Sequence, residues 1–174
     1  MIRVLSYSYP VGVIDEILTN HLRVFDNDQE LREDAIRCIK NAIDVASDYT
    51  NRVLCGSSVV MDFEAEVGAI IQLPTAPVSR VSHLYINGEE VGVDADDLES
   101  TNYSASIKLS ATPSGSTMAV RVEAECGYRE DLPGAIYQAV AIIANSFFEK
   151  GAEAEMPLAA KSLLNPYRIY PYEL

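Results

Sequence analysis

Apolar residues recur at helical spacing in the first third of the chain. A short run of this kind covers residues 13–22. A longer run begins near Asp26 and Asn27, which can cap a helix, and Glu30 completes a capping-box pattern with Asn27. The stripe of this longer run consists of Leu31, Ala35, Ile39, Ala42, Ala46, Tyr49 and Val53. The pattern predicts two amphipathic helices, the second of which ends by Gly56.

The middle of the chain changes to an alternation of apolar and polar residues, which is typical of strands with one buried face. The alternating segments are residues 59–63, 67–73, 78–86, 89–93, 105–109 and 118–124. Asn87-Gly88 separates two of them and predicts a tight hairpin, because both residues of such a turn need positive φ. An acidic loop (residues 94–102) and a Thr-Pro-Ser-Gly turn (residues 112–115) separate others. We expect five or six short antiparallel strands.

Helical spacing returns at Leu132, and Pro133 suits the first helical position, where its missing N–H costs nothing. The apolar positions of this helix are Ile136, Ala139, Val140, Ile142, Ile143, Ala144 and Phe147. They extend so far round the helix that it must be covered on most sides. Gly151 ends it, and one more short helix is expected over residues 157–164.

These elements predict an α+β fold. It combines a helical bundle, with a long N-terminal helix and a buried C-terminal helix, and an antiparallel β arm or sheet of five to six short strands. The 174 residues fit a single domain, residues 1–174, from which the aromatic segment 165–174 extends as a C-terminal tail.

The net charge of the chain argues against some classes of binding partner. The chain has 13 basic and 26 acidic residues, a formal net charge of −13, and 48% hydrophobic residues. The apolar content argues against disorder, and the acidity argues against binding to nucleic-acid phosphates or to an anionic membrane surface. The first ten residues lack the apolar core of a secretory signal, and no apolar run is long enough to span a membrane. We therefore expect a soluble intracellular protein.

Catalytic motifs are absent from the sequence. It has no HExxH, GxSxG, GxxxxGK[ST] or GxGxxG pattern, and its three cysteines, Cys38, Cys55 and Cys126, include no CxxC pair. A dyad of Cys126 with His83 is conceivable, but Cys126 alternates in register with Val120 and Val122 on an apolar strand face, where a thiolate is disfavoured. We expect no enzymatic activity and no cofactor.

The acidic loop is the best metal candidate in the sequence. It contains Asp94, Asp96, Asp97 and Glu99. An EF-hand loop would need an oxygen ligand at its fifth position and glycine at its sixth, where this sequence has Leu98 and Glu99. A solvated acidic loop is the default interpretation. The alternatives are an irregular Ca²⁺ or Mg²⁺ site, or a small enzyme that uses these carboxylates with a divalent metal.

The order of several short motifs resembles the head–tail connector (adaptor) proteins of long-tailed bacteriophages. The motifs are residues 21–24 (HLRV), Asp26, residues 49–52 (YTNR), 73–74 (LP), 76–78 (APV), Val81, residues 87–88 (NG), the segment 120–128 ending in CGY, residues 132–133 (LP), Ile136, Gln138, Ala139 and residues 163–168 (LLNPYR). They span nearly the whole chain. Two features depart from the family pattern: residues 148–151 (FEKG) stand where a Tyr-x-x-Arg-like end is common, and the segment before the first helix is longer and richer in Tyr.

The resemblance implies a structural virion protein. Such a protein forms a ring of twelve copies beneath the capsid portal, extends the DNA channel and provides the attachment surface for the tail or the next completion protein. It would assemble in the host cytoplasm and reside at the head–tail interface of the virion. The negative charge fits a lumen through which duplex DNA passes without specific binding. Another head- or tail-completion ring protein is the runner-up.

Two segments are candidate contact sites in this interpretation. The acidic loop with its flanking residues, Val93, Asp94, Asp96, Asp97, Leu98 and Glu99, is expected to contact a neighbouring subunit. In the tail, Tyr167, Arg168, Ile169, Tyr170 and Tyr172 are expected to dock on the portal, because tyrosines and nearby prolines lower the entropic cost of binding. Alternatively, the loop is a hairpin in solvent, and Tyr167 and Ile169 fold back onto the helices of their own subunit.

Overall fold

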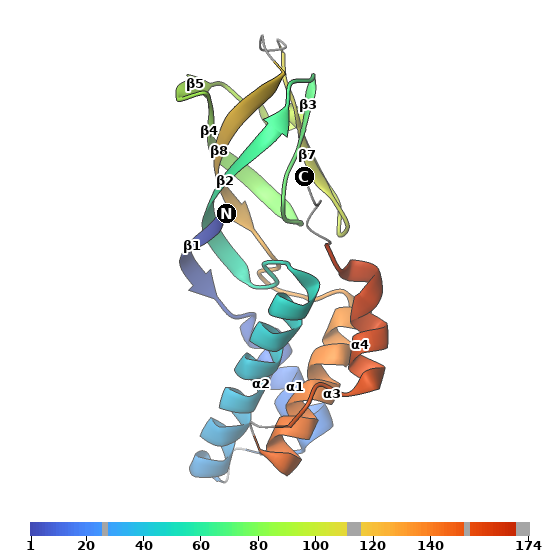
Figure 1. Cartoon of the computed structure of the whole chain (residues 1–174). Coiled ribbons are helices and arrows are strands. Elements are labelled where there is room, and N and C mark those ends of the chain that lie inside the picture. Colours follow the sequence, from blue (N-terminus) through green and yellow to red (C-terminus); the bar gives the residue numbers. More distant parts are fainter. Residues whose placement is uncertain (26–27, 111–115, 152–153, 170–174) are drawn as a thin grey trace. The chain divides into compact units, whose positions relative to one another are not determined.

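The computed structural model describes residues 1–25, 28–110, 116–151 and 154–169 (Figure 1). Contacts among Cα atoms divide the chain into two compact units. The β unit contains residues 1–8 and 56–127, and the helical unit contains residues 9–55 and the described residues from Tyr128 to Ile169. The fold class is α+β, as the sequence predicts, with helices and antiparallel sheets.

The helical unit is built from long and short helical elements. They are α1 (Val11–Ile17), the π-helical turn η1 (Leu18–Leu22), α2 (Gln29–Thr50), α3 (Gly134–Lys150), α4 (Leu158–Leu164) and the 3₁₀ turn η3 (Asn165–Tyr167). The predicted stripe of α3 is buried except for Ile142, which is partly buried, and this helix packs against α2, α4 and η1 (Figure 1). Among the described residues, no helix has both the length and the apolar character needed to cross a bilayer.

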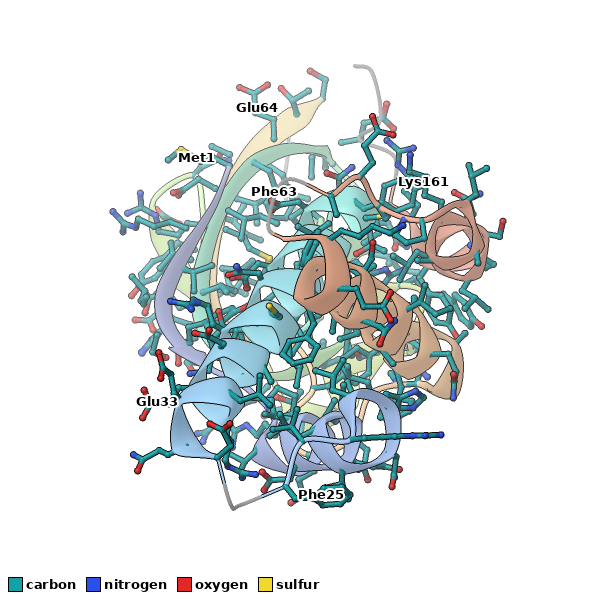
Figure 2. The ribbon with its side chains drawn as sticks, turned by 90° about the horizontal axis from the view of Figure 1, so that it is seen from below. Met1, Phe25, Glu33, Phe63, Glu64 and Lys161 are labelled. Atoms are coloured by element: carbon teal, nitrogen blue, oxygen red, sulfur yellow. The ribbon has the colours of Figure 1, made fainter. Side chains whose placement is uncertain are left out.

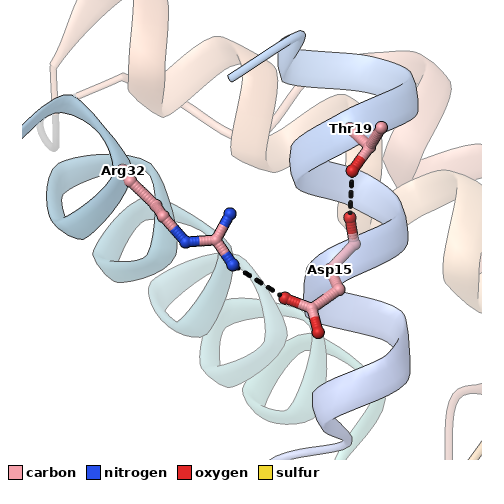
Figure 3. A network of polar contacts seen from close by, with 3 residues as sticks. All are labelled: Asp15, Thr19 and Arg32. Atoms are coloured by element: carbon pink, nitrogen blue, oxygen red, sulfur yellow. Dashed lines mark hydrogen bonds and ion pairs between the residues drawn. The ribbon is translucent and has the colours of Figure 1, made fainter. Parts of the chain in front are cut away.

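Arg32 joins the first two helices of this unit. Its Nη2 donates to Oδ1 of Asp15 in α1 at 3.1 Å, and Thr19 Oγ1 donates to the backbone carbonyl of Asp15 at 2.9 Å (Figure 3). Both side chains of the ion pair are substantially exposed to solvent, so this pair fixes orientation more than it stabilises the fold. The pair therefore helps to set how the polar face of α1 meets the start of α2.

Both ends of α2 differ from the sequence prediction. Asp28 caps the helix, since its side chain accepts from the Leu31 N–H at 3.0 Å, whereas Asp26 and Asn27 lie outside the described residues. The helix ends at Thr50 and does not continue to Val53, because Asn51 adopts left-handed geometry (φ 52°) and terminates it. The sequence predicts a longer helix because apolar residues also follow Asn51, and these residues are buried although they are not part of α2.

The other helix boundaries follow the predicted signals closely. Pro133 precedes the first turn of α3 as its N-cap, one position earlier than predicted, and Gly151 ends the helix with a φ of 90°. The predicted short helix over residues 157–164 is α4, which begins one residue later, at Leu158, with Pro157 as its N-cap.

The β unit contains two antiparallel sheets, whose strands are labelled in Figure 1. The five-stranded sheet has the order β1 (Ile2–Ser8), β2 (Gly56–Glu66), β8 (Thr117–Cys126), β4 (Val78–Ile86) and β5 (Glu89–Val91). The three-stranded sheet has the order β3 (Ile70–Gln72), β7 (Ala105–Lys108) and β6 (Leu98–Ser100). Buried apolar side chains come from both sheets and include Met61, Ile71, Leu84, Ile107 and Val122.

The Asn87-Gly88 hairpin is confirmed. Both residues have positive φ, 53° and 86°, and they join β4 to β5. The predicted Thr-Pro-Ser-Gly turn lies outside the described residues. The described residues form eight strands, where the sequence predicts five or six, because β1 and β6 lack clear alternation.

Candidate assembly surfaces

The first residues of the predicted tail lie against the C-terminal end of α2. The Ile169 N–H donates to the carbonyl of Thr50 at 2.8 Å, and Asn51 Nδ2 donates to the carbonyl of Ile169 at 2.9 Å. Arg52 is 5% exposed, and its Nε donates to the carbonyl of Tyr167. The first bond supplies a donor to the carbonyl of Thr50 at the end of α2, and the other two hold the tail backbone against the residues that follow the helix.

Side-chain contacts support the same arrangement. The Tyr49 hydroxyl donates to Oδ1 of Asn165 at 2.6 Å, and the Arg168 guanidinium lies 5.1 Å from the centre of the Tyr49 ring, a cation–π geometry. Tyr167 and Ile169 therefore fold back onto their own helices, which is the alternative stated for them above. Arg168 is exposed, and Tyr170 and Tyr172 lie outside the described residues.

The acidic loop has more regular structure than the sequence suggests. Residues 95–97 form a 3₁₀ turn, η2 (Ala95–Asp97), which Asp94 and Asp97 cap reciprocally: the Asp94 N–H donates to Asp97 Oδ2 at 3.1 Å. Leu98 and Glu99 belong to β6, which pairs with β7, so this part is a strand and not a loop. Asp94, Asp96 and Glu99 are exposed, whereas Val93, Asp97 and Leu98 are half-buried.

Two acids of this loop stabilise its own backbone. Asp94 and Asp97 already cap the turn, and among the described residues no three His, Cys, Asp or Glu side chains are arranged to hold a metal ion. The six loop residues that the sequence singles out lie together on one short segment of the β unit, and the described tail residues belong to the helical unit.

Cys126 and His83 do not form a dyad. Cys126 is 2% exposed at the end of β8, and burial raises the pKa of its thiol to about 12, so the thiolate is disfavoured. His83 lies on β4 opposite Glu123, is exposed, and contacts Glu90 instead, with 2.8 Å between Nδ1 and Oε1. The expectation that Cys126 lies on an apolar strand face is confirmed.

His83 is expected to titrate above its ordinary pKa of 6.5, because Glu90 hydrogen-bonds the charged imidazolium. A raised pKa in the folded state stabilises the β4–β5 pair below pH 6.5, and this contribution is lost as pH rises through the folded value. Proton NMR of the ring should show the raised midpoint, and Glu90→Gln should lower it. Glu89→Gln, next to the contact, is the control; an equal effect of both variants would contradict this assignment.

The polar face of the five-stranded sheet carries charges of both signs. Arg121 Nε donates to Asp62 Oδ1 at 2.6 Å, and this hydrogen bond lowers the pKa of Asp62. The pair borders a shallow hollow of about 650 Å³ that is also lined by Glu64, Tyr85 and Glu123. Its open, mixed-charge lining gives no constellation of nucleophile, base and oxyanion donor, the arrangement that an active site requires.

Sequence reasoning missed one surface, strand β1. Val4 and Leu5 of this strand are 45% and 59% exposed, and the strand forms one end of the five-stranded sheet. Its sequence, IRVLSYS, does not alternate between apolar and polar residues. Six of its seven residues are exposed, so no buried face imposes such an alternation. Elsewhere among the described residues, the large exposed apolar side chains are not adjacent in sequence, as at Phe25, whose ring lies outside the ribbon in Figure 2.

Comparison with solved structures establishes the fold over the full length. No family model and no curated protein sequence matches the chain. A chain from the virion of a native gene transfer agent (GTA) particle superposes with a TM-score of 0.72 at 18% identity. Chains from the neck of an empty GTA particle computed with C6 symmetry and of a native one computed with C12 symmetry give TM-scores of 0.67 and 0.66, at 23% and 19% identity. Each comparison covers 98% of this chain and 96% of the other chain.

Proposed function

We propose that the protein is a structural component of the neck of a phage-like particle, where it forms a ring at the head–tail junction. The observation that supports this most strongly is the end-to-end likeness to chains of GTA necks, because 98% of this chain and 96% of each neck chain superpose. Because one fold can serve unrelated functions, the proposal depends on this full coverage together with the neck particles from which the similar chains come.

In this role, the ring lies beneath the portal, extends the DNA channel and offers the next attachment surface for the tail or a completion protein. Twelve copies match the C12 symmetry with which one related neck was computed. The net charge of −13 on each copy suits a lumen that repels duplex phosphates, so DNA passes without specific binding. The protein acts without catalysis, assembles in the host cytoplasm and stays in the virion.

The direct test is binding to capsids that carry a portal but no neck. The purified chain should add a ring of density below the portal in electron micrographs, and isolated tails should then attach. Binding to tail ends but not to portals would favour the runner-up, a tail-completion ring protein. Failure to bind either structure would reject the neck role.

The acidic segment, residues 93–99, is the proposed contact with the neighbouring copy. Its exposed carboxylates are held outward by the capped turn and by β6, while Val93 and Leu98 offer half-buried apolar surface beside them. Because β6 pairs with β7 and Ser100 Oγ accepts from the Val78 N–H at 2.8 Å, deletion of this segment would disturb the β unit itself. Point substitutions are therefore the sharper test.

Reversing the charge of Asp96 and Glu99 together, as Asp96→Lys with Glu99→Lys, should abolish ring formation and leave the melting temperature within about 2 °C of the parent, as is usual for exposed sites. Electron microscopy and light scattering measure the rings, and calorimetry measures the melting temperature. The matched control is Glu149→Lys with Glu155→Lys, two exposed acids of the helical unit that give the same change in net charge. Rings of normal yield from the first variant would contradict this contact.

The tail is the proposed contact with the portal. Its first residues are anchored on α2, which places the exposed Arg168 at the start of the aromatic segment that contains Tyr170 and Tyr172. A chain that ends at Ile169 keeps the anchoring bonds, and it should lose binding to portal-bearing capsids by at least about tenfold, the size of one well-placed aromatic contact. Sedimentation of capsids with bound chain measures this loss; undiminished binding would place the portal contact elsewhere.

A further inference from the structure

The five-stranded sheet ends in two edges that differ in length, polarity and charge. Strand β1 forms one edge and β5 forms the other, and in the described part of the chain no strand pairs with the outer side of either. The two edges belong to the same β unit and lie at opposite ends of its strand order. Such edges pair readily with another strand unless charge, proline or a covering element prevents it.

Strand β1 has little of this protection. Its seven residues include no proline and no acid, and Arg3 is its one charged side chain. Val4 and Leu5 are 45% and 59% exposed, and a register shift between Val4 and Ser6 is its main irregularity. A long, apolar and weakly basic edge of this kind, in a chain with a net charge of −13, fits an acidic partner strand.

The opposite edge has that acidic character. Glu89 and Glu90 of β5 are exposed, and the chain continues through Gly92 into the acidic turn that Asp94 caps. Glu90 contacts His83 within the hairpin, and Glu89 is the other exposed acid of this strand. A longer strand from a neighbouring copy can pair with the open edge of β5 and so add a strand to the sheet.

We infer that β1 of one copy pairs with the β5 edge of the next copy, so that the five-stranded sheets join head to tail around the ring. This inference rests on the proposed ring and adds a contact between copies beside the one proposed for the acidic segment. A ring needs two different, complementary patches on each copy, whereas a two-fold contact uses the same patch twice and yields a dimer. Pairing β1 with β5 satisfies this requirement and brings the basic edge of one copy to the acidic edge of the next.

Cross-linking between two variants, each with one accessible cysteine added, tests the pairing. One variant carries Leu5→Cys and the other Gly92→Cys, where a Cβ meets no atom within 4 Å, and both carry Cys38→Ser so that only the buried Cys55 and Cys126 remain. The two variants are mixed in equal amounts at high concentration and treated with a short bis-maleimide. The expected result is a cross-linked dimer in the mixture and none with either variant alone. Glu64→Cys in place of Gly92→Cys is the control and should give no product.

Three other outcomes would overturn the inference: a dimer from Leu5→Cys alone, which indicates β1 paired with β1; equal products with the Glu64→Cys control; or no product at all. Rings below portals without the mixed product would reject this pairing and leave the proposed function intact. The mixed product together with failure to bind portals would retain the pairing and reject the neck role.

Charge reversal provides a second, independent measurement. Arg3→Glu and Glu89→Arg should each weaken self-association at low salt by about fivefold, the upper range for an exposed ion pair. The double variant should recover the parental value, because exchanging the two charges restores a pair of opposite sign at every contact between copies. Light scattering over a concentration series measures the effect, and a double variant as weak as the single variants would contradict the pairing.

Discussion

A chain that ends at Asn165 should melt about 8 °C below the full chain, a shift equivalent to about 3 kcal/mol in a protein of this size. The truncation removes the Ile169 and Tyr167 groups that bond the end of α2, including the carbonyl that accepts from the buried Arg52 side chain. It also removes the Arg168 side chain from the Tyr49 ring. A buried guanidinium that loses an acceptor is costly, because its desolvation is no longer compensated.

The matched control is the chain that ends at Ile169, which keeps all of these contacts and should melt within about 2 °C of the full chain. Calorimetry or circular dichroism of both truncations measures the difference. Equal melting temperatures for the two truncated chains would show that the contacts at the end of α2 add little to stability. The pair of truncations also separates two roles of the C-terminal segment: residues up to Ile169 stabilise the subunit, and the residues beyond it are proposed to bind the portal.

The helices were largely predictable because their signals are local. The stripe of α2 and the wide apolar surface of α3 follow directly from spacing, and Gly151 ends α3 by the left-handed geometry that glycine favours. The Asn87-Gly88 hairpin was predictable for the same reason, since two adjacent residues determine the turn.

The elements that escaped prediction depend on distant partners. Strand β1 forms by pairing with β2, far along the chain, and most of its side chains are exposed, so no alternation marks it. The end of α2 depends on the left-handed Asn51, whose amide binds the carbonyl of Ile169, 118 residues away. Apolar residues beyond Asn51 continue the helical spacing by coincidence, because they are buried by other contacts.

The candidate contact surfaces were predictable in part. The sequence marks the acidic segment and the aromatic tail by composition alone, but it does not distinguish an acid that caps a turn, such as Asp97, from one that is exposed to solvent, such as Asp96. It also does not show that Tyr167 and Ile169 meet α2 while Arg168 remains exposed. Those distinctions arise from backbone geometry, which the structure supplies.

The wide apolar surface of α3 leads to the last prediction. Ile143 is 0% exposed, and its helix packs against α2, α4 and η1. Ile143→Ala should therefore leave a cavity with no route for solvent or a neighbouring side chain to fill it, and it should lower the free energy of unfolding by about 3–4 kcal/mol. Denaturant titration should show this as a lower midpoint with an unchanged slope.

The adjacent Ile142 gives a matched control on the same helix, because it is only partly buried at the edge of the core. Ile142→Ala removes the same atoms at a position where solvent and nearby side chains can occupy the space, so the expected loss is about 1 kcal/mol. Equal losses for the two variants would mean that the two positions are enclosed to the same degree, contrary to their difference in burial. A much larger loss for Ile143→Ala would show that α2, α4 and η1 enclose this position of α3 too tightly for the cavity to be filled.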